Sequence, residues 1–171
     1  MHEKQWEWRE LSEEVVFSKE GFQLRLMPSR GNLQVSGDIK KALQYLNLDI
    51  PILGMDGLAK DDFALAIGRN KVLVSTRDHL NVRNGWFEEG IIITSADYQW
   101  KLLALEGPAA RMVLAQGVLS GLSSPSCITF VFGKTSLLVK SETGYLLFVE
   151  APYLQYFVDC LESCDIIKAE V

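Results

Sequence analysis

The chain has 171 residues, of which 48% are hydrophobic and 23% are charged. This length suits one compact domain, or two small halves that share a core, and the hydrophobic fraction excludes a disordered chain. The 22 acidic and 17 basic residues give a net charge of −5 at pH 7. That balance argues against a nucleic-acid partner, because general nucleic-acid binders carry an excess of basic side chains.

Neither a membrane span nor an export signal is predicted. The N-terminal residues are strongly charged and lack the apolar stretch of a signal peptide. Residues 112–133 contain no charged side chain, but Gly117, Gly121 and Pro125 interrupt the apolar run, whereas a spanning helix needs about 20 predominantly apolar residues. The three cysteines cannot all pair with one another, so we expect reduced thiols. These features predict a cytoplasmic protein with no membrane partner.

The first half of the chain reads as strands, then one helix, then a hairpin. Alternating apolar residues predict a hairpin over residues 15–26, and after a turn at residues 28–31 we expect residues 33–35 to continue the same meander. Apolar residues then recur at helical spacing from Ile39 to Leu46, with Asp38 at the start of this helix. Short apolar runs at residues 63–67 and 72–75 predict another hairpin.

The second half repeats this order of elements and adds a terminal helix. Strands are expected near residues 91–94, 100–105, 128–132, 136–139 and 145–149. Gly107 and Pro108 open a short helix that ends near Gly117, with Ala110, Val113 and Leu114 on its buried side. A last helix begins at Pro152, and its apolar residues are Leu154, Phe157, Val158 and Leu161. Runs of strands with few helices predict an antiparallel α+β fold.

We divide the chain into an N-terminal arm at residues 1–14, a first α+β half at residues 15–85 and a second at residues 86–171. The two halves are expected to form one compact unit.

No residues form an evident catalytic or metal site. Cys160 and Cys164 are four residues apart on the last helix, but two thiolates do not complete a zinc site, and the two histidines lie far from them in sequence. We interpret the pair as half-buried core residues, with no bound metal and no disulfide. His79 lies in a polar loop beside Asp78, which could orient it, yet no serine or cysteine in a strained turn accompanies it. A solvated loop histidine is the default interpretation, and spatial pairs remain open.

Three tryptophans stand outside any apolar alternation. Trp6 and Trp8 belong to the charged arm, and Trp86 follows a polar loop. Because tryptophan is enriched at interface hot spots, these three residues are the candidate partner contacts. Burial in the core remains open for each of them.

The stretch from Gly90 to Cys164 resembles a known family. Residues 92–95 (Ile-Ile-Thr-Ser), followed by residues 100–117 (Trp-Lys-Leu-Leu-Ala-Leu-Glu-Gly-Pro-Ala-Ala-Arg-Met-Val-Leu-Ala-Gln-Gly), are similar to the strand, Gly-Pro and helix unit of the folate-binding T-protein superfamily. That superfamily includes glycine-cleavage aminomethyltransferases, folate-dependent iron–sulfur assembly proteins and the γ-subunit of heterotetrameric sarcosine oxidase. The γ-subunit is the most similar in length and in the sequence of this Gly-Pro unit. The motif residues carried over are Ser95, Gly107, Pro108, Ala110 and Arg111.

The resemblance implies a T-protein-like fold with two ferredoxin-like halves. It also implies a non-catalytic accessory subunit of a flavin-dependent, sarcosine-type amine oxidoreductase, in which larger flavoprotein subunits carry the chemistry and this chain binds no cofactor. The family's strand-end Asp is replaced by Ile93, which leaves little for a folate site. The alternatives are a free-standing tetrahydrofolate-binding aminomethyltransferase-like protein and a small-ligand-binding α+β module.

Overall fold

The computed structural model describes residues 15–54, 57–59, 61–87, 90–118, 122 and 126–165. The predicted arm at residues 1–14, with Trp6 and Trp8, lies outside the described residues. The described strands are β1 (Val15–Lys19), β2 (Phe22–Leu26), β3 (Gly31–Ser36), β4 (Ile52–Leu53), β5 (Phe63–Gly68), β6 (Lys71–Thr76), β7 (Gly85–Phe87), β8 (Ile91–Ser95), β9 (Trp100–Glu106), β10 (Ser126–Val131), β11 (Lys134–Lys140) and β12 (Gly144–Glu150). The described helices are α1 (Ile39–Tyr45), α2 (Ala110–Ala115) and α3 (Leu154–Ser163), the last preceded by the 3-10 turn η1 (Ala151–Tyr153).

The strands form two six-stranded sheets. The first sheet has the order β1-β2-β9-β12-β11-β10, and the second has the order β4-β5-β6-β3-β8-β7. All pairings between the named strands are antiparallel except the short parallel pair of β4 with β5. The predicted α+β class is therefore confirmed.

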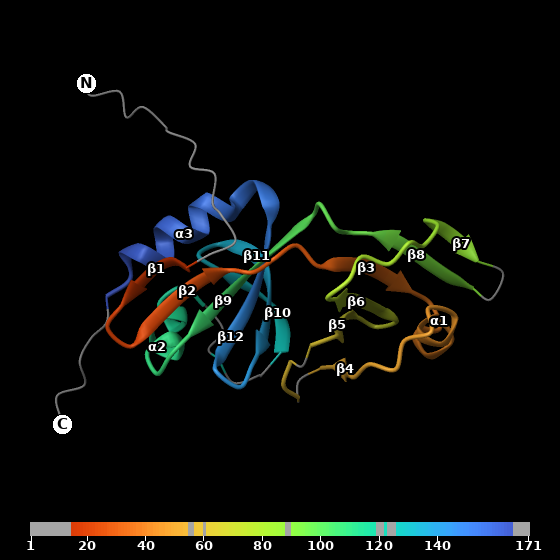
Figure 1. Ribbon diagram of the computed structural model, residues 1–171, viewed down its shortest axis with the longest axis horizontal. Helices are drawn as coiled ribbons and strands as arrows, with labels where there is room; N and C mark the ends of the chain where they lie inside the picture. Colours follow the sequence, from red (N-terminus) through yellow and green to blue (C-terminus); the bar gives the residue numbers. More distant parts are fainter. Residues whose placement is uncertain are drawn as a thin grey trace, which may run out of the picture.

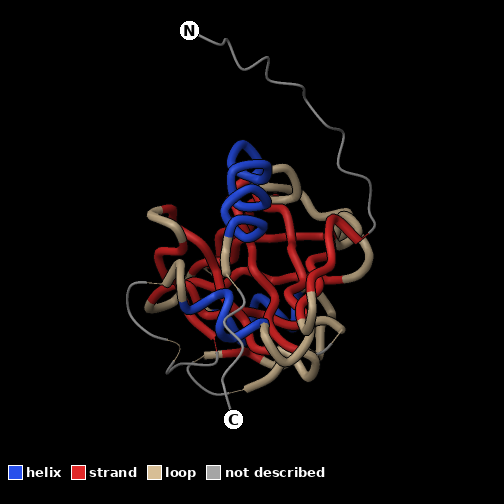
Figure 2. Tube along the Cα trace, turned by 90° about the vertical axis from the view of Figure 1, so that its left-hand side faces the viewer, coloured by secondary structure: helices blue, strands red, loops and turns tan. Residues whose placement is uncertain are grey.

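The two sheets pack against each other, and the helices cover their outer faces (Figure 1). Helices α2 and α3 pack on the outer face of the first sheet, and α1 packs on the outer face of the second. Figure 2 shows the strands in the interior, with the long helix α3 on their outside. The layer order is thus helices, first sheet, second sheet, helix.

Strand β12 shows how the sequence supplies both faces of the first sheet. Successive side chains of a strand point to opposite faces, so Tyr145, Leu147 and Val149 face the helices, while Phe148 faces the second sheet. The Phe148 ring meets the Phe63 ring edge-on at 6.1 Å between centroids. Because both faces of β12 are covered, this strand is almost continuously apolar.

The chain crosses between the sheets twice, and this corrects the expected meander. Strand β3 does not continue the first hairpin as a meander; it pairs with β6 and β8 in the second sheet. The free side of β2 is taken by β9 instead. The first crossover joins Leu26 to Gly31, and the second returns from Ser95 to Trp100.

The sheets consequently do not coincide with the predicted halves at residues 15–85 and 86–171. Strands β1 and β2 belong to the sheet built mainly from the second half, and β8 belongs to the other sheet. The physical reason is antiparallel pairing between the two crossing segments, in which β2 meets β9 and β3 meets β8.

The predicted helices and their buried faces are confirmed. Asp38 caps α1 by accepting a hydrogen bond from the backbone N–H of Lys41 at 3.2 Å. The buried side chains of α2 are Ala110, Val113 and Leu114, and those of α3 are Phe157, Val158 and Leu161. None of the described helices is long and apolar enough to cross a membrane.

Candidate functional site

The Gly-Pro motif is held in place by a close backbone approach. Gly107 has a φ of +103°, and a Cβ there would lie 2.5 Å from the carbonyl oxygen of Gly21. The N–H of Ala109 donates to that same carbonyl at 2.9 Å. Only glycine fits this turn without strain, so Gly107 fixes the start of α2 against the β1–β2 turn.

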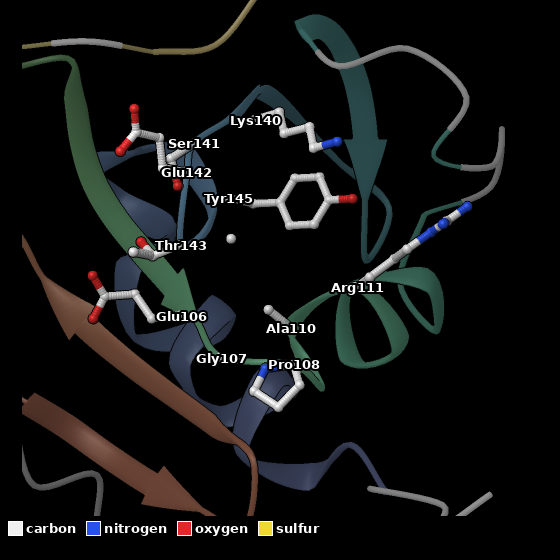
Figure 3. A pocket seen from close by; sticks show the side chains of 11 residues that line it. Glu106, Gly107, Pro108, Ala110, Arg111, Lys140, Ser141, Glu142, Thr143 and Tyr145 are labelled. Carbon is white, nitrogen blue, oxygen red and sulfur yellow. The ribbon is translucent and has the colours of Figure 1, made fainter.

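Four of the five motif residues line one groove. The groove has a volume of about 670 Å³ and lies between the start of α2 and the β11–β12 turn. Gly107, Pro108, Ala110 and Arg111 form part of its wall, as Figure 3 shows. The volume falls within the range of small-molecule sites, but the groove is wide open to solvent.

The charged side chains of this groove divide into two sides. In Figure 3 the side chains of Lys140 and Arg111 extend to one side, with the hydroxyl of the buried Tyr145 pointing the same way. Glu106 and Glu142 lie on the other side, and Glu106 is 3.7 Å from Arg25. Such a surface suits a ligand or polypeptide with charges of both signs. The lining includes no histidine or cysteine, and therefore no nucleophile paired with an imidazole base.

The fifth motif residue, Ser95, lies apart from the groove. It ends strand β8, where its N–H donates to the side-chain oxygen of Asn84 at 2.6 Å. Its hydroxyl donates to Asp97 at 3.2 Å. The structure therefore places Ser95 at the second crossover and not beside the other motif residues.

His79 finds a partner that the sequence did not reveal. Its Nδ1 lies 3.3 Å from a carboxylate oxygen of Asp97, and not beside the neighbouring Asp78, which the sequence had offered as a possible orienting group. The same carboxylate oxygen accepts the hydroxyl of Ser95, and its other oxygen accepts the N–H of Asn32 at 2.6 Å. Because the serine hydroxyl is directed to Asp97, it is not activated by His79. This cluster ties a loop to the crossover.

The residues present do not fit a folate at the family's strand-end position. Ile93, which stands there, is fully buried in the core between the second sheet and α1. An apolar side chain inside a core offers no polar group to a pterin. We derive no chemistry from that position.

Trp86 is a surface residue, as the candidate-contact prediction requires. It is 73% exposed in the edge strand β7. It pairs with Ile92, which is 37% exposed, and this row continues through Ser36 to Lys71. These four residues lie on the face of the second sheet that also meets the first sheet, in a part that the first sheet leaves open. We call them the Trp86 row.

The sequence did not indicate that several other apolar residues are exposed. Tyr98 is 93% exposed in the second crossover, and Ile128 and Phe130 are about half exposed on edge strand β10. The alternation of Ile128 and Phe130 predicts a strand but cannot show that the strand lies at a sheet edge. The topology shows this, because β10 ends the first sheet.

Cys160 in α3 and Cys164, directly after this helix, are free thiols that serve mainly in packing. Cys164 is buried and Cys160 is partly buried, as expected for core residues. Burial, followed by the nearby Cys160, raises the pKa of the Cys164 thiol above its ordinary 9.0. The described residues contain no group of three or more potential metal ligands. The side chain of Cys127 lies outside the described part of the chain.

Comparison with known proteins gives a likeness of fold. No family model matches the sequence, and no curated protein matches it. Among solved structures, the chain is similar to a chain of the heterotetrameric sarcosine oxidase from Corynebacterium sp. U-96 in complex with pyrrole 2-carboxylate. The TM-score is 0.68 at 16% identity, over 90% of this chain and 91% of that chain. The two chains therefore share one fold along nearly their whole lengths.

Proposed function

We propose that this chain is a non-catalytic accessory subunit of a flavin-dependent, sarcosine-type amine oxidoreductase complex. The observation that carries the proposal is the similarity of fold to a chain of a heterotetrameric sarcosine oxidase over nearly all of both chains. A match limited to one half would be weaker support, since small α+β units recur in unrelated proteins. The resemblance of residues 90–164 to the γ-subunit supports the same assignment.

The described site residues are consistent with a role in binding. The groove beside α2 holds charged and hydroxyl groups without an imidazole base, and the Ser95 hydroxyl is tied to Asp97. In the proposed complex the larger flavoprotein subunits carry the redox chemistry. This chain contributes a folded surface.

The Trp86 row is the surface that we assign to the partner. An exposed tryptophan beside an exposed isoleucine offers a large apolar area, and anchors of this type dominate the binding energy of protein interfaces. The polar Ser36 and the basic Lys71 continue the row, which suits a partner surface with an apolar pocket next to acidic groups. Larger flavoprotein subunits are the proposed partners.

Co-expression tests the proposal. The tagged full chain is produced with candidate large flavoprotein subunits from the same organism, and size-exclusion chromatography is followed by protein and flavin absorbance. We expect one peak that contains all subunits. Trp86→Ser should weaken assembly at least about tenfold because a hot-spot anchor is removed. Tyr98→Ser, which alters a more exposed aromatic elsewhere on the surface, is the matched control and should leave assembly unchanged.

A second candidate, tetrahydrofolate binding by the free chain, is favoured only by the volume of the groove beside α2. Calorimetry of the isolated chain with tetrahydrofolate separates the two. Saturable folate binding, together with elution apart from the flavoprotein subunits, would reject the accessory-subunit proposal.

A further inference from the structure

A small cavity lies where the two crossovers run side by side. Its volume is about 130 Å³, and residues 26–30 and 100–102 form most of its wall. The segments are joined there by backbone hydrogen bonds, Met27 N–H to Leu102 at 2.9 Å and Ala96 N–H to Asn32 at 2.7 Å. The cavity is distinct from the groove beside α2, with which it shares no residue.

Asn32 lines this cavity and carries an unsatisfied acceptor. The residue is only 3% exposed, and its side-chain oxygen is buried with no hydrogen-bond partner. Its side-chain nitrogen lies 3.3 Å from the carbonyl oxygen of Arg30. That carbonyl can only accept, so the contacting atom must be the NH₂ group and the amide orientation is fixed. The unpartnered atom is therefore an acceptor.

A buried acceptor without a donor is costly, so a donor is expected from the adjoining space. Leaving such a group unpaired costs about 1–3 kcal/mol, and nearly all buried polar atoms in proteins have a partner. Asn32 borders the cavity. The oxygen itself is almost fully covered, so the side chain must turn before a donor held in the cavity can reach it.

The cavity is lined by cations but by no acid. Arg30 and Lys101 are its charged lining residues. Arg30 stacks at 5.8 Å on Phe63 and donates through Nε to the Ser75 hydroxyl at 2.9 Å, while its Nη2 lies 3.6 Å from Asp62. These contacts use Nε and Nη2. Burial, the leading cause, lowers the pKa of Arg30, which indicates that its charge is incompletely solvated.

The size of the cavity limits the ligand. A dry cavity of about 150 Å³ holds benzene, which has six heavy atoms, so this cavity suits a molecule of similar size. The apolar lining residues Leu26, Met27, Trp100 and Leu102 would contact its carbon atoms. We propose that the crossover cavity binds a small carboxylate that bears a hydroxyl or amino donor on the adjacent carbon. The donor meets the side-chain oxygen of Asn32, and the carboxylate lies toward Arg30 and Lys101.

Glycolate and acetate form a matched pair of probes for this site. Both are small monoanions at neutral pH, but only glycolate has a hydroxyl to donate. The full ¹⁵N-labelled chain is titrated with each, and the side-chain amide signals of Asn32 are followed by NMR. Saturable shifts are expected with glycolate, at least about tenfold tighter than with acetate. Glycine is titrated in parallel to distinguish an amino from a hydroxyl donor.

Two variants and one control keep the test decisive. Asn32→Leu removes the acceptor at similar volume and should abolish the preference for glycolate. Lys101→Gln removes one cation on a partly exposed side chain. It should weaken the binding of both anions severalfold without affecting the fold. Gln34→Leu makes the same amide-to-apolar change two residues along β3, outside the cavity lining, and should leave both titrations unchanged.

The possible outcomes separate a ligand site from a hydrated void. Equal affinity for glycolate and acetate would overturn the proposal, and so would the absence of saturable shifts for glycolate and glycine, which would leave an ordered water as the donor. If Asn32→Leu fails to fold, the decision rests on Lys101→Gln and on the glycolate-to-acetate ratio of the unmodified chain. These binding measurements do not depend on flavoprotein subunits, so they stand apart from the proposed function.

Discussion

Phe148 tests whether the two sheets pack face to face as one core. Its side chain is fully buried between them and contacts the Phe63 ring. Truncation to alanine removes the whole ring from a site lined by both sheets. Such substitutions typically cost about 3–5 kcal/mol, including the cavity left behind, and the aromatic contact accounts for about 0.5–1.5 kcal/mol of this. Against a total stability of about 5–15 kcal/mol for a domain, Phe148→Ala should be severely destabilised.

Urea denaturation followed by circular dichroism measures this change. With a slope of about 2 kcal/mol per molar urea, the midpoint should fall by roughly 2 M. The matched control is Phe130→Ala on β10, because Phe130 lies on the same face of the first sheet but is 56% exposed. That change should stay within about 0.5 kcal/mol. Should Phe148→Ala fail to fold, Phe148→Leu provides a milder loss. Equal losses for the two alanine variants would refute the packing of one sheet on the other.

Three further substitutions test local features of the fold by the same denaturation assay. Gly107→Ala should cost at least about 2 kcal/mol, because the new Cβ meets a carbonyl oxygen at a positive φ; Gly133→Ala, at positive φ but in open space, should cost less. Above about pH 9 the unmodified chain should lose stability that Cys164→Ala retains, because the raised pKa of this thiol means that the unfolded chain releases its proton first. A parallel pH dependence in both proteins would contradict that assignment. Asp97→Ala should destabilise by about 1–3 kcal/mol, because the N–H of a buried residue loses its acceptor.

The elements were predictable because their signals are local. The helical spacing from Ile39, the cap at Asp38 and the helix after Gly107 and Pro108 each depend on a few neighbouring residues. The structure has all three, with α2 beginning at Ala110, two residues after the predicted start. The sheet topology was not predictable from the sequence, because the alternation of Leu33 and Val35 indicates a strand but not the strands with which it pairs. Pairing of β3 with β8 depends on residues about sixty positions away.

The candidate site was likewise predictable only where its residues are neighbours in the sequence. The motif residues from Gly107 to Arg111 are contiguous and line one groove. Ser95 was grouped with them because of the family motif, but it belongs to another cluster. It ends β8 in the second sheet, before the second crossover brings the chain to the first sheet. The orphaned oxygen of Asn32 has no sequence signal at all, since it depends on the burial created by two distant segments.

The role of Asp97 can be isolated by comparison with Asp78. Both aspartates are near His79, one in space and one in sequence, but only the Asp97 carboxylate contacts the imidazole. One oxygen of Asp97 also accepts the N–H of Asn32. This bond links the second crossover to β3, the strand that follows the first crossover. Asp97→Ala therefore removes a bond between the two crossings, whereas Asp78→Ala removes only a solvated charge. Asp97→Asn retains an acceptor oxygen and should recover most of the lost stability. If Asp78→Ala costs as much as Asp97→Ala, the charge of the loop matters and not the hydrogen bond, and the crossovers are held together by their backbone hydrogen bonds and apolar packing.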